Sequence, residues 1–456
     1  MISEKFLERM KRLLGDGYGD FVTSLEEPSV RAIRINRTKI SVEDFLKITE
    51  HKLSPIEYTD CGFIPESTEG IGVGAEHHAG LFYVQDPGAM ATACALDIQP
   101  GWWVLDTCAA PGGKSSQMAS AIGEDGFLLA NEYVPKRAKI LVSNFERLGI
   151  KNSMVTSLDT AELGGMFDGA FDLVLCDAPC SGEGMFRKYS DASEMWSEEN
   201  VAACATRQRE ILANVAGLVR PGGYLLYSTC TYSTEENEET VRDFLDSHRE
   251  FSLAPVSQEV RAVTSDGITL CDCDYDMRLT RRFYPHKSQG EGQYIALMQR
   301  AENECKKQII LYKEQTISPS KEEIKVTEKF MSDNFSEWRS HRLIKQGEYV
   351  VAVPHSCPIP KRSVFMPGII LGEVKKGVFF PHHQLFSAYG GQMKRQENLR
   401  ATDPRVERYL RGEEIEAESV SDSGWCAVCY EGIPMGGGKV SSGRIKNHYP
   451  KGLRNK

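Results

Sequence analysis

The sequence lacks any long apolar run, and this absence limits the class of protein. Within its 456 residues no hydrophobic segment reaches the roughly 18 residues that cross a bilayer. Residues 1–20 combine an amphipathic pattern with charges of both signs, instead of the apolar stretch of a signal peptide. We therefore expect a cytoplasmic protein without a membrane anchor. Its hydrophobic content of 41% is sufficient for two or three folded domains.

The chain also lacks an excess of positive charge and a cysteine pattern typical of disulfides. Its net charge of −10 argues against nonspecific coating of nucleic acid, although a local basic surface is compatible with an acidic total. The thirteen cysteines are odd in number and irregularly spaced, so we expect reduced thiols. Two close pairs, Cys271 with Cys273 and Cys426 with Cys429, raise the alternative of a zinc module. Because the pairs fall in different expected domains, we favour structural thiols and no metal.

Alternating strand and helix patterns over residues 76–300 predict an α/β fold with a mostly parallel sheet. The strand-like segments are WWVLDT, FLLANE, DLVLCDAP and YLLYSTC, each followed by a helix or a loop. A helix over 202–219 is expected to stop at the RPGG tetrapeptide of residues 220–223. Near the end of this region, RFYPHKSQGEGQYIALMQR predicts two strands around a glycine-bearing turn that close one edge of the sheet.

Three further segments flank this core. Residues 1–75 are expected to form an α+β extension, and the polar residues 301–325 a linker. Residues 326–456 combine a helix with short strands, which predicts a small α+β or barrel-like domain. The last twenty residues contain six lysines or arginines and no acidic residue, so this end of the chain carries a local basic segment.

One strand of the extension, over residues 29–36, alternates arginines with apolar side chains. The alternation places Arg31 and Arg34 on or near an exposed surface. A solvated edge strand and a basic strand that faces a nucleic acid both fit this pattern.

The stretch VLDTCAAPGGK, at residues 104–114, predicts a ligand site where a strand turns tightly into a helix. Its small residues let a ligand approach the backbone N–H groups at the helix N-terminus. Glu132 ends the next strand, where a carboxylate is suited to accept hydrogen bonds from ribose hydroxyls. Asp159 follows the strand after that and is either a contact for an adenine amino group or an ordinary loop residue. The pattern indicates an adenosine-containing cofactor.

Two cofactors compete for this site, a nicotinamide dinucleotide and S-adenosylmethionine. A dinucleotide needs a G-x-G-x-x-G turn that leaves room for its pyrophosphate, and CAAPGGK does not match that turn. S-adenosylmethionine carries no phosphate and tolerates the departure. The alternative to both is a sharp connection with no ligand.

Two cysteines, Cys180 and Cys230, stand at the carboxyl ends of two expected strands. Beside a methyl donor they suit one chemistry, in which a thiolate adds to carbon 6 of cytosine and makes carbon 5 nucleophilic. Asp177 is placed to neutralise charge that builds at N3, and the second thiol to assist release of the product. This chemistry does not decide which cysteine attacks, and a packing role is the alternative for either. For Cys108 and Cys176, which flank the site, packing is the expected role.

After Cys230 the chain continues as Ser-Thr-Glu-Glu-Asn-Glu-Glu over residues 233–239. The spacing of Ser233 and Glu236 is that of a helix capping box, and an acidic first turn suits the helix dipole. This segment is expected to have no catalytic role.

Long motifs in the chain resemble the Sun/Fmu class of RNA (cytosine-5) methyltransferases, and within it the bacterial ribosomal RNA small-subunit methyltransferase F group. The motifs are QDPGAM, LDTCAAPGGK, ANEYVPKRAKIL, DAPCSGEGMFRK, YSTCTYSTEENE and RFYPHKSQGEGQYIAL, which together span about residues 84–298. The resemblance implies a Rossmann-like core with a seven-stranded sheet and one antiparallel edge strand. It also implies an N-terminal RNA-binding extension and a C-terminal PUA-like domain, the latter resting on GIPMGGGKVSSGRIKNHYPKGLR.

The resemblance assigns roles that spacing alone leaves open. It implies that Cys230 is the nucleophile and that Cys180 aids product release. The implied contacts to S-adenosylmethionine are Cys108, Ala109, Ala110, Pro111, Gly112, Gly113, Lys114, Glu132, Arg137, Asp159 and Asp177. The implied partner is RNA, namely 16S ribosomal RNA or the small subunit, with the chain acting as a monomer and without a membrane. Two alternatives are a noncatalytic ribosome-assembly factor and a nicotinamide-dependent oxidoreductase.

Overall fold

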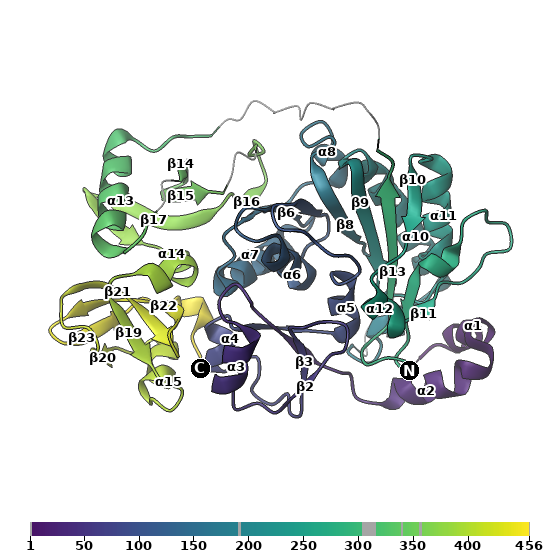
Figure 1. The fold of residues 1–456 in the computed structure, drawn as a ribbon, viewed down its shortest axis with the longest axis horizontal. Coiled ribbons are helices and arrows are strands. Elements are labelled where there is room, and N and C mark those ends of the chain that lie inside the picture. The colour runs from purple at the N-terminus through teal and green to yellow at the C-terminus, as the bar shows by residue number, and fades with distance from the viewer. Residues whose placement is uncertain (1, 190–192, 303–315, 339–340, 355–357, 456) are drawn as a thin grey trace.

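A computed structural model of the chain describes residues 2–189, 193–302, 316–338, 341–354 and 358–455. Figure 1 shows an α/β core, with the N-terminal helices below one end of it and the C-terminal sheets on the opposite side. Within the described ranges, no helix is long and apolar enough to cross a membrane.

The core alternates strands with helices as the sequence predicts. Its main elements are β5 Trp103–Asp106, α6 Gly113–Ile122, β6 Phe127–Asn131, α7 Pro135–Leu148, β7 Ser153–Thr156, α8 Thr160–Leu163, β8 Phe171–Asp177, α10 Glu198–Ala216, β9 Val219–Thr229, α11 Glu238–Ser247, β10 Phe251–Ala254, α12 Gln258–Ala262, β11 Ser265–Asp266, β12 Arg281–Phe283 and β13 Gln293–Arg300. The four expected strands are confirmed as β5, β6, β8 and β9.

One sheet organises this core, with the strand order β11-β12-β13-β9-β8-β5-β6-β7-β16 and with β10 paired to β13. Strands β7, β6, β5, β8 and β9 are parallel, whereas β13 runs antiparallel to β9 and β12. In the described part of the chain the sheet has ten strands, wider than the seven expected. The carboxyl ends of the five parallel strands meet at one edge, where ligands of such sheets bind.

Alternate residues of the parallel strands enter two separate cores. Leu105 and Val174 lie in the cluster on one face of the sheet, and Val104 and Leu173 in the cluster on the other. All four are fully buried, which explains why these strands read as continuous apolar runs.

The helix that precedes β9 ends earlier than the sequence suggests. Helix α10 stops at Ala216, and the RPGG tetrapeptide belongs to β9 itself, where Gly222 has a φ of 74°. Glycine tolerates this left-handed conformation, so the tetrapeptide bends the start of the strand and does not serve as the helix stop.

The N-terminal region packs a small antiparallel sheet against the core. Its main elements are α1 Glu4–Leu14, α2 Tyr18–Glu26, β1 Ala32–Ile35, α3 Val42–Ile48, β2 Leu53–Pro55, β3 Gly62–Pro65, α4 Ala75–His78, β4 Phe82–Gln85 and α5 Pro87–Thr92. The strand order is β2-β3-β1-β4.

The expected exposure of Arg34 is wrong, whereas Arg31 is exposed. Arg34 is only 3% exposed. Its guanidinium donates to Gln85 Oε1 at 3.0 Å, and to the carbonyl of Gly113 at 3.1 Å. Arg34 therefore joins the N-terminal sheet to the start of α6, and its buried donors are satisfied.

The C-terminal region contains two small sheets and one further strand that joins the core sheet. Its main elements are α13 Lys321–Asn334, β14 Arg342–Gln346, β15 Tyr349–Val353, β16 Val364–Met366, β17 Ile369–Lys375, β18 Val378–Pro381, α14 His383–Tyr389, β19 Gln396–Leu399, α15 Arg405–Leu410, β20 Ile415–Glu416, β21 Gly424–Tyr430, β22 Ile433–Ser441 and β23 Arg444–Asn447. The sheet orders are β14-β15-β17-β18 and β19-β21-β22-β23-β20.

Two contacts tie this C-terminal region to the rest of the molecule. Strand β16 pairs antiparallel with β7 of the core sheet, and apolar residues of the N-terminal region and the last sheet share one buried cluster. The expected linker over 301–325 lies largely outside the described residues, and α13 begins within its span.

Candidate active site

The turn between β5 and α6 is held in place by hydrogen bonds to Asn131 and Arg137 of the neighbouring elements. Asn131 accepts the Ala109 N–H at its backbone carbonyl, at 2.8 Å, and Arg137 donates to the Ala110 carbonyl at 2.7 Å. Gly112 adopts a φ of 113°, and a Cβ at that position would lie 3.0 Å from Leu141. Only glycine fits this position, and α6 begins directly after it with its first backbone N–H groups at the carboxyl edge of the sheet.

Glu132 lies beside this turn with one oxygen left unsatisfied. The residue is 3% exposed, and its Oε1 accepts the Val134 N–H at 2.9 Å. Its Oε2 is buried and has no hydrogen-bond donor among the described residues, although Arg137 lies 3.4 Å away as an ion pair. A buried acceptor without a donor fits the hydroxyl groups of a ribose. The loop and Glu132 therefore fit an adenosine-containing cofactor.

Asp159 lies at the same edge but is already used within the fold. It is exposed and forms the N-cap of α8, where its carboxylate accepts the Ala161 N–H at 3.0 Å. Glu162 completes a capping box with it. The local geometry thus explains Asp159 without a ligand, and its expected contact with adenine stays a prediction.

Asp177, at the end of β8, forms an ion pair with Lys114 of the cofactor turn. Lys114 Nζ lies 2.8 Å from Oδ2 of Asp177, and Ser228 Oγ donates to Oδ1 at 2.6 Å. Burial lowers the pKa of the Lys114 ammonium, but the charge of Asp177, with a smaller contribution from Cys230, raises it above its ordinary value. Lys114 therefore keeps a positive charge between the cofactor loop and the cysteines.

The sulfur atoms of Cys180 and Cys230 are 3.2 Å apart, and both residues are partly exposed free thiols. The backbone N–H of Cys230 also points to the Cys180 sulfur, at 3.4 Å. The hydrogen bond between the two thiols, followed by burial, raises the pKa of Cys180 well above its ordinary value. Cys180 thus retains its proton near neutral pH.

Two other thiols flank the site. Burial raises the pKa of Cys108 to about 12, and Cys176 is fully buried in the core of the sheet. Both therefore stay protonated, and Cys176 packs in the core as expected, whereas the packing role of Cys108 stays a prediction.

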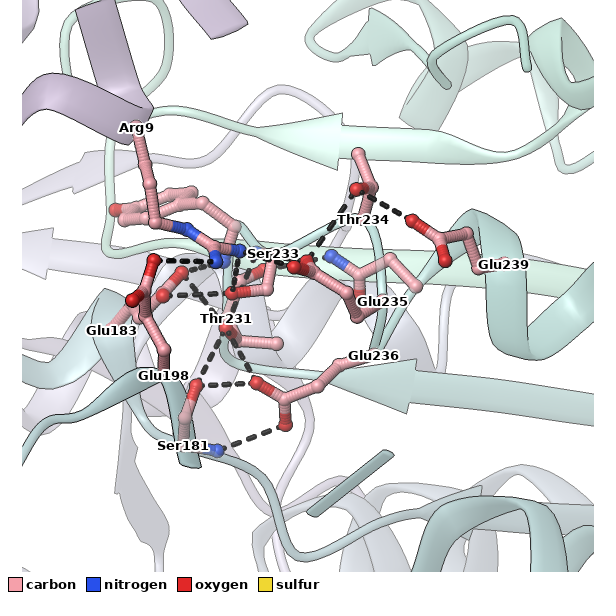
Figure 2. Close-up of polar contacts among 12 residues, drawn as sticks. Arg9, Ser181, Glu183, Glu198, Thr231, Ser233, Thr234, Glu235, Glu236 and Glu239 are labelled. Atoms are coloured by element: carbon pink, nitrogen blue, oxygen red, sulfur yellow. Dashed lines mark hydrogen bonds and ion pairs between the residues drawn. The ribbon is translucent and has the colours of Figure 1, made fainter. Parts of the chain in front are cut away.

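The loops that carry the two cysteines are joined by a pair of buried carboxylates, which Figure 2 shows in close-up. Glu183, from the Cys180 loop, accepts the Tyr232 N–H and the Ser233 hydroxyl, each at 2.8 Å. Glu236, from the Cys230 loop, accepts the Ser181 N–H at 3.0 Å and the Ser181 hydroxyl. Each loop therefore supplies the carboxylate that holds the other.

The expected capping box at Ser233 and Glu236 is wrong. Helix α11 begins at Glu238, and its N-cap is Asn237, which makes no side-chain cap hydrogen bond. Ser233 and Glu236 instead bond to the Cys180 loop. Sequence reasoning missed the roles of Glu183 and Glu236 in joining the two loops, and the signal for these roles was their place beside the two cysteine motifs.

The Cys230 loop is also tied to the N-terminal helix α1. Arg9 lies 2.7 Å from Glu235 and 3.8 Å from Glu198 as ion pairs. Figure 2 shows the Arg9 side chain extending from its helix toward this acidic cluster.

The cysteines considered for a zinc module lie apart in the fold. Cys426 and Cys429 are buried within β21, where Cys426 donates to the Gly438 carbonyl. Cys271 and Cys273 precede β12, with Cys273 packed beside the core cluster. Among the described residues, no group of three His, Cys, Asp or Glu side chains is placed to hold a metal ion.

Three family models match successive parts of the chain. The model described as 16S rRNA methyltransferase RsmB/F matches residues 93–299. The N-terminal domain of 16S rRNA methyltransferase RsmF matches residues 2–87, and the RsmF PUA domain matches residues 396–455.

Solved structures share the fold of the core. A methyltransferase homologue from Pyrococcus horikoshii is 28% identical, with a TM-score of 0.58, over 65% of this chain and 95% of that protein. NSun6 from the same organism is 22% identical, with a TM-score of 0.56, over 66% of this chain and 99% of its own.

Curated relatives match the chain over nearly its full length. Ribosomal RNA small subunit methyltransferase F of Vibrio campbellii is 32% identical, over 99% of this chain and 97% of the relative. The protein of the same name from Klebsiella pneumoniae is 30% identical, over 99% of this chain and 96% of its own length. The chain belongs to the ribosomal RNA small subunit methyltransferase F family.

Proposed function

We propose that the chain transfers a methyl group from S-adenosylmethionine to carbon 5 of cytidine in 16S ribosomal RNA. The observation that carries this proposal is the convergence of two thiols, 3.2 Å apart, with the Lys114–Asp177 pair at the edge of a cofactor loop. Family membership supports the same activity.

The cofactor would be held by the turn over Cys108–Lys114 and by Glu132, whose unsatisfied Oε2 suits a ribose hydroxyl. When bound, S-adenosylmethionine supplies an electrophilic methyl group. Arg137 supports the site by donating to the Ala110 carbonyl and pairing with Glu132. We include Asp159 as a cofactor contact because it follows the carboxyl end of β7, at the N-cap of α8.

Cys230 is the nucleophile in this proposal. Its thiolate adds to carbon 6 of the cytosine, which makes carbon 5 nucleophilic. The Lys114 ammonium, whose pKa Cys230 helps to raise, supplies positive charge beside the reacting sulfur. Asp177 is proposed to share a proton with N3 of the base, and the ammonium of its Lys114 partner would offset the negative charge that develops there.

Cys180 acts after methyl transfer. A base, which solvent water can supply, then takes the proton from carbon 5. Its bonding electrons restore the C5–C6 double bond, and the Cys230 sulfur leaves carbon 6 as a thiolate. Cys180 lies 3.2 Å from that sulfur and is proposed to assist this release. The target cytidine has to leave any helix in which it is paired before Cys230 can reach carbon 6.

The regions on either side of the core are proposed to bind the RNA. We assign residues 1–75 to an N-terminal RNA-binding extension, 76–300 to the catalytic domain, 301–325 to a linker and 326–456 to a PUA-like domain. In the last of these, exposed lysines 439, 446 and 451 suit phosphate contacts. We propose a monomer that works on ribosomal RNA in the cytoplasm.

The test supplies the purified chain with S-adenosylmethionine carrying a labelled methyl group. The RNA is naked 16S ribosomal RNA, assembled small subunits or large-subunit RNA, and bisulfite sequencing locates the product. We expect 5-methylcytidine in small-subunit RNA and none with Cys230→Ala. Binding of RNA without methylation would favour a noncatalytic assembly factor, and methylation of large-subunit RNA would overturn the substrate assignment.

A further inference from the structure

We propose that Glu236 is a positioning residue that fixes Cys180 against Cys230, so that the Cys180 thiol donates its proton toward the Cys230 sulfur. The proposal deepens the function above and rests on its assignment of Cys230 as the nucleophile. Glu236 itself is fully buried.

The contacts of Glu236 bracket Cys180 on both sides. Its Oε2 accepts the Ser181 N–H at 3.0 Å and Gln208 Nε2 at 2.8 Å. The same Gln208 amide donates to the Pro179 carbonyl at 3.0 Å. The residues before and after Cys180 are therefore held by Glu236 or by the side chain that it binds, which fixes the position of the sulfur between them.

Glu183 completes the connection in the opposite direction. It accepts the Tyr232 N–H, the Ser233 hydroxyl and the indole N–H of Trp196, each at 2.8 Å. The Thr231 hydroxyl lies 2.9 Å from Glu183 and 3.2 Å from Glu236, so it links the two carboxylates (Figure 2). A shift of either loop would therefore break hydrogen bonds to a buried carboxylate, which is costly.

The charges around the two sulfur atoms have opposite signs. Lys114 is a cation whose pKa Cys230 helps to raise. The pKa of Cys180 is raised first by the Cys230 hydrogen bond and by burial, and the negative charge of Glu236 makes a smaller contribution in the same direction. In the described part of the chain, Glu236 has no ion pair with a lysine or arginine. A cation beside one thiol and an anion beside the other orient the shared proton onto Cys180.

The other titratable groups that face Glu236 do not reverse this order. Burial raises the pKa of Cys204 on α10 to about 11, and burial also raises the pKa of Tyr227, whose hydroxyl donates to the Glu236 carbonyl. Both stay neutral near pH 7. Burial, with a smaller contribution from Glu183, raises the pKa of Glu236 itself, whereas the hydrogen bonds from Ser181 and Gln208 lower it and so favour the carboxylate.

The test measures the reactivity of each thiol as a function of pH. The purified full chain, without RNA or cofactor, is alkylated with iodoacetamide from pH 6 to 10, and peptide mass spectrometry reports Cys180 and Cys230 separately. We expect Cys230 of the unchanged chain to react at lower pH than Cys180. In Glu236→Gln, alkylation of Cys180 at pH 8 should rise severalfold, because one of the charges that disfavour its thiolate is gone.

Glu239→Gln is the matched control. Glu239 accepts from Thr234 at 3.0 Å in the same acidic segment, and its substitution should leave both pH profiles unchanged. Profiles of a folded Glu236→Gln that match those of the unchanged chain would overturn the proposal. A merely structural role would alter stability without reordering the two thiols.

A conservative variant covers the case in which Glu236→Gln fails to fold. Glu236→Asp keeps the charge but shortens the side chain, so the ratio of Cys230 to Cys180 alkylation should fall about threefold. A ratio equal to that of the unchanged chain would contradict the positioning role. Because the assay needs neither RNA nor S-adenosylmethionine, its outcome is independent of whether methyl transfer is observed.

Discussion

The sulfur of Cys180 lies 3.2 Å from the sulfur of Cys230, which is a hydrogen-bonding contact between two free thiols. The contact follows from the sheet, because β8 and β9 pair in parallel with Asp177 opposite Ser228. The two loops therefore leave the sheet at the same level, and each cysteine lies two or three residues beyond that point.

The ion pair between Lys114 and Asp177 should contribute to the free energy of unfolding, so the effects of substituting the two residues should not be additive. In Lys114→Met the carboxylate loses its cationic partner. We expect a loss of about 1–3 kcal/mol in the free energy of unfolding, less than for a fully buried pair because 30% of the Asp177 side chain is exposed. Urea unfolding of the two single variants and of Lys114→Met/Asp177→Asn measures this coupling. Single-variant costs that simply add would contradict it.

Glu132 should matter more for cofactor affinity than Asp159. Glu132→Gln replaces the buried oxygen that lacks a donor, whereas Asp159→Asn alters an exposed helix cap. A hydrogen bond to a charged group contributes about 1.5–3 kcal/mol, so we expect the Kd of S-adenosylmethionine to rise about tenfold or more in Glu132→Gln. Calorimetric titration checks the order. A larger increase in Kd from Asp159→Asn than from Glu132→Gln would contradict the assignment of the ribose contact to Glu132.

Asp106 should make stability depend on pH. Burial, with a smaller contribution from the charge of Asp177, raises the pKa of the Asp106 carboxyl from 3.8 to about 7. Between these two values the folded chain holds a proton that the unfolded chain has released, so this contribution to stability is lost as pH rises toward 7. Compared with Asp106→Asn, the Tm of the unchanged chain should therefore fall between pH 5 and 7.5. If the Tm values of the unchanged chain and of Asp106→Asn changed in parallel over this pH range, the raised pKa of Asp106 would be contradicted.

Gly184 should tolerate no side chain. A Cβ there would lie 2.6 Å from the Gly292 carbonyl oxygen and 3.0 Å from that of Cys230, and neither backbone can move cheaply. We expect Gly184→Ala to cost about 1–3 kcal/mol of stability and to lower kcat for methyl transfer. Gly72→Ala, at a position with open space, is the control and should change neither quantity.

The sequence predicts the parts of the site that depend on local order. The turn of residues 104–114 and the thiols at Cys180 and Cys230 follow directly from strand ends, because parallel strands converge at one edge. The residues that hold these parts in place depend on distant contacts. Arg34 is buried because Ser116, 82 residues away, accepts its hydrogen bond, and alternation along one strand carries no information about that partner.

Glu236 and β16 illustrate the same limit. The spacing of Ser233 and Glu236 satisfies a capping box. In the structure, however, the Glu236 carboxylate accepts a hydrogen bond from the backbone N–H of Ser181, 55 residues away. Strand β16 reaches the core sheet by backbone pairing with β7, and such pairing leaves no mark in the side-chain pattern. Tertiary contacts therefore override local patterns at both places.

The central claim is that Cys230 forms the covalent bond to the base and Cys180 helps to break it. The most direct measurement is denaturing gel electrophoresis of the chain incubated with S-adenosylmethionine and labelled small-subunit RNA. We predict no protein–RNA adduct with Cys230→Ala and an accumulating adduct with Cys180→Ala. An adduct that persists in Cys230→Ala would contradict the assignment.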